Sequence, residues 1–120
     1  MIQPVFKISS ADHTENSIVV LLEVDADSDI FSGHFPGQPV VPGACMLQTV
    51  KETLEDVFKV SLRMVKADNI KFLNIVTPDA VDLILKISYT SIDGELKIAA
   101  DLSSGEQLFM KLQAVFSGLV

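Results

Sequence analysis

The chain has 120 residues, 48% of them hydrophobic and 21% charged, which predicts one globular domain over residues 1–120 rather than a disordered chain. The formal net charge of −7 argues against nucleic-acid binding, because that needs a basic surface. No apolar run approaches the roughly 18 residues of a membrane-spanning helix, no signal peptide is recognisable, and the single cysteine, Cys45, excludes an internal disulfide. We therefore expect a soluble, cytoplasmic protein.

The charges are unevenly spread along the chain. Residues 1–50 hold one cation, Lys7, against six acids, whereas residues 51–71 hold five cations against four acids. This second region is the only one with a slight positive excess. It is either a solvated helix end and strand edge, or a docking patch for an acidic partner.

The first predicted element is a strand over Ser17 to Val24, a β-branched run that is too short for a helix. The polar stretch 25–29 then ends it. After a proline-rich segment, residues 43 to about 58 form the only helical pattern of the chain. Its apolar face carries Gly43, Met46, Leu47, Val50, Leu54, Val57 and Phe58.

Five strands are predicted beyond the helix, over residues 62–69, 70–76, 81–91, 95–102 and 108–116. Turn-forming residues separate the later ones, and Asp93-Gly94 is the strongest hairpin signal. The fold class is therefore α+β, with one long helix against a sheet of five or six mostly antiparallel strands. One helix covers one face of such a sheet, so we expect a homodimer with the sheets joined edge to edge.

The segment from Phe31 to Gly43 holds three prolines, three glycines and His34 in thirteen residues. Its prolines exclude a strand or a helix interior. A histidine titrates near neutral pH, and the free N–H groups of a helix start attract negative charge. His34 is therefore either an ordinary loop histidine or half of a proton-transfer site. Gly43 follows a proline, a residue that is common at helix starts, and needs no further role there. Its backbone N–H can also donate to a substrate, and the two interpretations are compatible. His13, in what reads as a polar turn, is given no role.

Gln48 and Glu52 are one helical turn apart and point away from the apolar stripe. This is a solvated face or, if a second subunit covers it, a working site. Cys45 lies on the same side. A place in the first helical turn could lower its pKa, but a small buried hydrophobe is the favoured role. No Cys/His spacing indicates nucleophilic catalysis or a zinc site, and no cofactor or metal is predicted.

The run from Gly33 to Gly43, GHFPGQPVVPG, closely resembles the signature of the 3-hydroxyacyl-[acyl-carrier-protein] dehydratases, which have the hotdog fold. The resemblance extends to residues 67–79, ADNIKFLNIVTPD, and covers residues 28–92 in all. It implies a central helix wrapped by a curved sheet, and a dimer, or a higher oligomer of dimers, with two sites at the subunit interface. It also implies an acyl chain that is carried on the phosphopantetheine arm of acyl carrier protein.

Carried over by position, the resemblance makes His34 the base that removes the C2 proton of the substrate, and the Gly43 N–H the donor that polarises the thioester carbonyl. Phe35 and Cys45 are predicted to contact the substrate. The chain departs from the family where the acid is expected, because Gln48 stands there and an amide cannot supply a proton. Glu52 stands one turn on, where many members of the family have Gln. We therefore predict that Glu52 provides the acid, directly or through water.

Three functions follow from these residues. The first is a dehydratase that turns 3-hydroxyacyl thioesters on acyl carrier protein into trans-2-enoyl thioesters, in fatty-acid or related lipid or polyene synthesis. The second is an acyl thioesterase, which needs a carboxylate such as Glu52 to activate water. The third is a non-catalytic acyl-binding or partner subunit, in which Gln48 records the loss of the acid.

Overall fold

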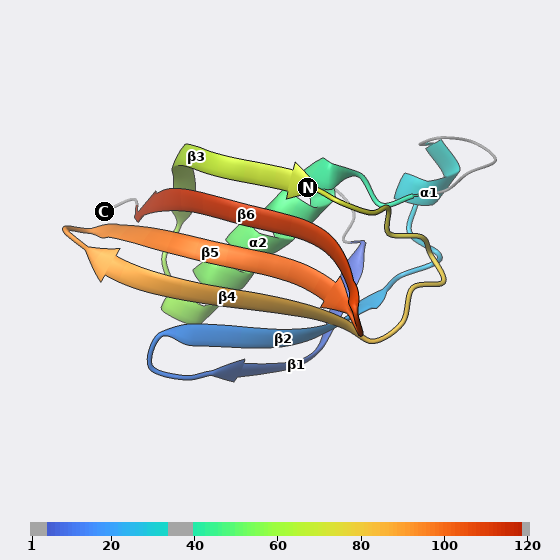
Figure 1. Ribbon diagram of the computed structural model, residues 1–120, viewed down its shortest axis with the longest axis horizontal. Coiled ribbons are helices and arrows are strands. Elements are labelled where there is room, and N and C mark those ends of the chain that lie inside the picture. The colour runs from blue at the N-terminus through green and yellow to red at the C-terminus, as the bar shows by residue number, and fades with distance from the viewer. Residues whose placement is uncertain (1–4, 34–39, 119–120) are drawn as a thin grey trace.

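The structure is a computed structural model that describes residues 5–33 and 40–118. One long helix, α2 (Gly43–Phe58), lies behind a curved sheet in Figure 1. A single helical turn, α1 (Ile30–Gly33), precedes it. The predicted helix is confirmed at both ends. It begins after Pro42 and ends at Lys59, which has a left-handed backbone and donates its N–H to the Glu55 carbonyl at 2.8 Å.

Six strands form one sheet in the order β1-β2-β4-β5-β6-β3, and every neighbouring pair is antiparallel. The strands are β1 (Phe6–His13), β2 (Ser17–Val24), β3 (Leu62–Phe72), β4 (Leu83–Ile92), β5 (Glu95–Ser104) and β6 (Gln107–Gly118). The sheet edges are thus β1 and β3, which lie at the bottom and top of Figure 1.

The core fills the space between α2 and the sheet face that it covers, which we call the inner face. Val50 and Leu54 of α2 are fully buried against alternate residues of the strands, such as Leu85 and Leu112. The intervening strand residues point to the opposite, outer face, as the period of two requires. Glu55 ties the helix to the start of β3, because its carboxylate accepts the Leu62 N–H at 2.8 Å.

Three predictions about the elements were wrong. β1 was not predicted, and His13 ends this strand instead of lying in a polar turn. The predicted strands 62–69 and 70–76 are one strand, β3, which ends at Phe72 and carries two irregularities in its pairing with β6. Residues 31–33 were expected to lie outside any helix, but they belong to α1.

His13 belongs to an aromatic cluster that joins three elements. Its ring lies 5.9 Å from that of Phe58 and 5.8 Å from that of Tyr89, between ring centroids. The Tyr89 hydroxyl donates to the Glu15 carbonyl at 3.0 Å and lies 2.6 Å from His13 Nε2. The cluster therefore fastens the β1–β2 hairpin to β4 and to the C-terminal end of α2, which is a structural role.

Candidate active site

The N-terminus of α2 lies where the chain leaves the proline-rich segment. Pro42 has an extended backbone, with φ −62° and ψ 145°, and no side chain caps the helix. The preceding Val41 N–H donates to the Val76 carbonyl at 2.8 Å, which ties this helix start to the segment after β3. The first N–H groups of a helix have no acceptor within it. Gly43 therefore offers a backbone donor at a fixed position.

The side chain of Phe72, the last residue of β3, packs onto Gly43. A Cβ atom at position 43 would lie 2.6 Å from the tip of the ring and 2.9 Å from its two neighbouring carbons, which is closer than such contacts occur. Phe72 pairs with the buried Met110 and shares the inner face with it. Its side chain is still 49% exposed. Phe72 is therefore a wall of the site, and sequence reasoning gave it no role.

Gln48 and Glu52 lie together on the outward side of α2. The Gln48 amide donates a hydrogen bond to the Glu52 carboxylate, with 3.1 Å between Nε2 and Oε1. The Thr49 hydroxyl donates to the Cys45 carbonyl at 2.8 Å, and the Thr53 hydroxyl donates to the Thr49 carbonyl at 2.8 Å, on the turns next to this pair. The predicted pairing of Gln48 and Glu52 on one face is thus found. In the single chain this face is open to solvent, with Glu52 exposed and Gln48 half-buried.

Glu52 also borders a hollow of about 410 Å³ between α2 and the β1 edge of the sheet. Apolar side chains from the first two strands form one wall, and the polar residues of the helix form the other. The lining residues are Phe6, Ile8, Leu22, Thr49, Glu52, Thr53 and Asp56. The carboxylate therefore lies beside apolar surface on one side and beside Gln48 on the other.

Cys45 is a buried thiol, as the sequence favoured. Its side chain is 7% exposed, and burial raises the pKa of the Cys45 thiol above its ordinary value. The alternative, a pKa lowered by the helix start, is wrong, because desolvation of the thiolate is the larger effect here. Cys45 lies within one helical turn of Gly43 and packs there as a small apolar group.

Two predicted residues, His34 and Phe35, lie outside the described residues. The structure places Gly43, Cys45, Gln48 and Glu52 along the first three turns of α2, and of these it brings Gln48 and Glu52 into contact. It adds Phe72 from β3.

Within residues 5–33 and 40–118, no group of three or more His, Cys, Asp or Glu side chains could hold a metal ion. In the same ranges no helix is both long and apolar enough to span a membrane.

The chain is similar to dehydratases in sequence and in fold. The profile of the ApeI-like family, described as ApeI dehydratase, matches residues 10–110. A 3-hydroxyacyl-[acyl-carrier-protein] dehydratase, FabZ of Lactococcus lactis subsp. lactis, is 36% identical over 50 residues, which are 41% of this chain and 33% of that protein. FabZ of Syntrophobacter fumaroxidans is 29% identical over 104 residues, 79% of this chain and 70% of that protein.

Among solved structures, one chain of the dehydratase heterocomplex ApeI:P from Xenorhabdus doucetiae matches with a TM-score of 0.75 and 21% identity. The match covers 92% of this chain and 96% of that one. At this identity it shows the fold, which is the predicted hotdog fold, with a single long helix inside a curved antiparallel sheet. Because the family profile matches most of its length, the chain belongs to the ApeI-like dehydratase family.

Proposed function

We propose that the chain is a hydro-lyase that converts 3-hydroxyacyl thioesters, carried on acyl carrier protein, into trans-2-enoyl thioesters. The observation that carries the proposal is the paired arrangement of Gln48 and Glu52 on α2, which begins at Gly43 without a side-chain cap. The two side chains lie about one and a half and two and a half helical turns beyond Gly43. Besides a base, dehydration needs a donor to the thioester carbonyl and an acid that protonates the leaving hydroxyl, and a protonated Glu52 is such an acid.

In the proposed reaction His34 takes the proton from C2, and the Gly43 N–H stabilises the negative charge that develops on the thioester oxygen. The C2–H electron pair forms the C2=C3 double bond as the C3–O bond breaks. Glu52, in its protonated form, gives its proton to the departing hydroxyl, directly or through water, so that water leaves and the carboxylate remains. Gln48 has no proton to supply, but its amide holds Glu52 and can hydrogen-bond to the substrate hydroxyl.

A second subunit is part of the proposal, because Gln48 and Glu52 face solvent in the single chain. β3 is an edge strand, and Val65, Ile70 and Phe72 on it are between 38% and 49% exposed. An exposed apolar edge of this kind pairs readily with another strand. A homodimer joined at β3 would extend the sheet and bring His34 of one subunit toward the α2 face of the other.

To test the proposal, the purified chain is given a 3-hydroxyacyl thioester of acyl carrier protein. The absorbance of the enoyl product and the release of free thiol are then measured. The proposal predicts that the enoyl product forms without release of thiol, and that His34→Ala abolishes its formation. Thiol release in place of enoyl absorbance would indicate a thioesterase. Since dehydration is reversible, the enoyl thioester is offered as well, and turnover of neither compound would contradict catalysis by the chain alone.

One observation favours a second candidate, a partner subunit that binds acyl chains without turnover. Gln48 stands where the signature has an acid, and the matching structure from Xenorhabdus doucetiae is a heterocomplex. In that case the chain would act only when paired with a second, catalytic hotdog chain. A soluble dimer that binds the thioester but neither dehydrates nor hydrates it would favour this role.

A further inference from the structure

The part of the sheet formed by strands β3 to β6 carries charge opposite to that of the whole chain. Strands β3 to β6 hold six of the nine cations and three of the sixteen acids, a net charge of +3. The rest of the chain holds three cations against thirteen acids, a net charge of −10. We call the six cations the basic face. They are Arg63, Lys66, Lys71, Lys86, Lys97 and Lys111.

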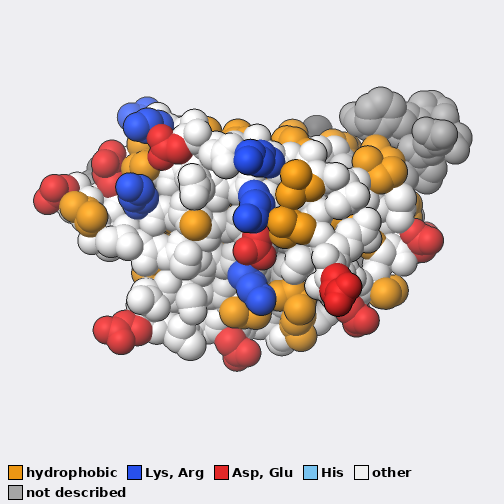
Figure 2. Space-filling model, viewed as in Figure 1, with side chains coloured by type: hydrophobic (Ala, Val, Ile, Leu, Met, Phe, Trp, Pro, Cys, Tyr) orange, Lys and Arg blue, Asp and Glu red, His pale blue; other side chains and the backbone are white. Residues whose placement is uncertain are grey.

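Strand register places these cations on one surface. Lys71 pairs with Lys111, Lys111 with Asp101, and Asp101 with Lys86, so one row crosses four strands. Directly opposed residues share a face, and both neighbours of Lys111 in β6, Met110 and Leu112, are core residues. Figure 2 shows basic side chains, with an acidic one among them, in a line across the middle of this face.

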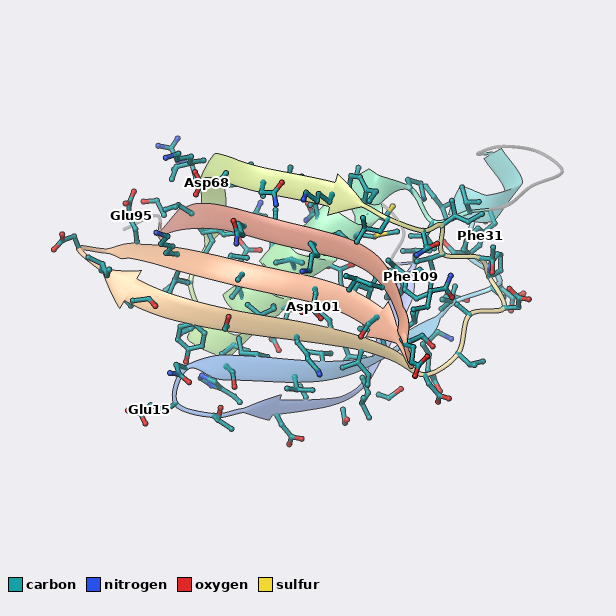
Figure 3. The ribbon with its side chains drawn as sticks, viewed as in Figure 1. Glu15, Phe31, Asp68, Glu95, Asp101 and Phe109 are labelled. Carbon is teal, nitrogen blue, oxygen red and sulfur yellow. The ribbon has the colours of Figure 1, made fainter. Side chains whose placement is uncertain are left out.

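The other three cations lie at the far end of the same face. Lys97 and Lys66 both pair with Val115, and Arg63 pairs with Ser117. Their acidic counterparts are Asp68 and Glu95, which Figure 3 labels at that end, whereas Asp101 lies near the centre. In the described parts of the chain only Lys66 of the six is in an ion pair, with Asp68 at 3.1 Å. All six side chains are exposed.

The row of lysines ends beside the candidate site. Lys71 points to the outer face, and the next residue, Phe72, points to the inner face and packs onto Gly43. Phe72 is also the last residue of β3, so the edge strand stops there. A molecule on the basic face is therefore next to the point where a flexible arm could pass the end of β3 toward the helix start. Edge-to-edge pairing of β3 leaves this face open, since strand hydrogen bonds lie in the plane of the sheet.

We propose that the basic face is the docking surface for the acidic protein that carries the acyl thioester, an inference that rests on the proposed function. The docking patch that the sequence suggested in residues 51–71 is thereby relocated. Lys51 lies on α2 and Lys59 caps its C-terminus, while Arg63, Lys66 and Lys71 join lysines from β4, β5 and β6. Charge complementarity decides the occupant, because a strongly acidic chain with one local reversal of sign attracts an acidic protein there and repels it elsewhere.

The test compares two triple variants that both change the net charge to −10. The first removes charge from the basic face, by Lys86→Gln, Lys97→Gln and Lys111→Gln. The control removes the three cations that lie elsewhere, by Lys7→Gln, Lys51→Gln and Lys59→Gln. Binding of fluorescently labelled acyl carrier protein is measured by anisotropy at low and physiological ionic strength. Turnover is measured with the carrier-bound substrate and with a short thioester that has no protein.

The face variant is expected to weaken carrier binding and lower kcat/KM for the carrier-bound substrate by about tenfold or more at low salt. The short thioester should be turned over as by the unaltered chain. The control should stay within about twofold, because its charges lie outside the basic face, with Lys51 and Lys59 on or just after α2 and Lys7 on the edge strand β1. Equal losses in both variants would overturn the proposal. So would binding of the unaltered chain to anionic phospholipid vesicles but not to the carrier. If the chain turns over neither substrate, the proposed function fails, yet the anisotropy result still decides where the carrier docks.

Discussion

The amide of Gln48 donates its hydrogen bond to the Glu52 carboxylate at 3.1 Å, and this bond orients both side chains on the outward face of α2. The amide nitrogen faces the acid, so the carbonyl oxygen of Gln48 is directed elsewhere and can accept from a substrate hydroxyl. In the proposed reaction the two residue types divide what one acid does alone, with Gln48 recognising the hydroxyl and Glu52 supplying the proton.

This division predicts unequal effects of substitution. Glu52→Gln should lower kcat by about 10²–10⁴-fold, the usual contribution of a general acid. The exchanged variant, Gln48→Glu with Glu52→Gln, keeps one acid and one amide within a turn of each other and should retain most of the turnover. Enoyl absorbance under saturating substrate measures both. Full turnover by Glu52→Gln would show that His34 and Gln48 suffice.

Gly43→Ala should fold, because the Phe72 ring that a new Cβ would meet is half-exposed and can swing away. The displaced ring should lower kcat/KM. In a Phe72→Ala background the space beside residue 43 is open. Gly43→Ala should therefore destabilise that variant less than it destabilises the unaltered chain. A double-mutant cycle on thermal stability is expected to give a coupling of about 0.5–3 kcal/mol, as for residues in contact. Strict additivity would show that the two residues do not touch in solution.

Cys45 should react slowly with iodoacetamide at neutral pH and faster only under alkaline conditions. Its pKa is raised by burial, so less thiolate is present at any given pH than for an exposed thiol. Cys45→Ala should leave kcat nearly unchanged, since the thiol has no proposed chemistry. Rapid alkylation of the folded protein near pH 7, with loss of activity, would contradict this account.

Tyr89→Phe should destabilise the fold without changing turnover. The substitution keeps the ring contact with Phe58, 5.1 Å between centroids, and removes the hydroxyl that bonds to Glu15 and His13. A net loss of about 1 kcal/mol per hydrogen bond is typical, which lowers Tm by roughly 2–8 °C for domains of up to about 250 residues. An unchanged Tm would show that these hydrogen bonds are not formed in solution.

The sequence predicted the parts of the fold that have a clear hydrophobic period. The helix over residues 43–58 was found because its apolar residues recur at the helical spacing. β1 was missed because only its first residue, Phe6, is buried, so the strand has no alternation. β3 was divided in two because irregular pairing near Val65 and Asp68 breaks its period of two.

The site was predicted to a similar degree. A motif that is contiguous in sequence pointed to Gly43, and the helical period placed Gln48 beside Glu52. Phe72 was not assigned a role because its contact with Gly43 joins residues far apart in sequence. The basic face could not be predicted from the sequence for the same reason, because only the strand register brings Lys71, Lys86 and Lys111 into one row.

The most direct test of the proposed site is a crystal structure of the chain with a bound 3-hydroxyacyl thioester analogue. We predict a dimer in which a His34 nitrogen lies about 3–3.5 Å from C2 of the analogue, the separation of reacting groups. Glu52 of the partner subunit should face the C3 oxygen. A His34 ring that points into bulk solvent, with no α2 helix of a second subunit opposite, would contradict the account.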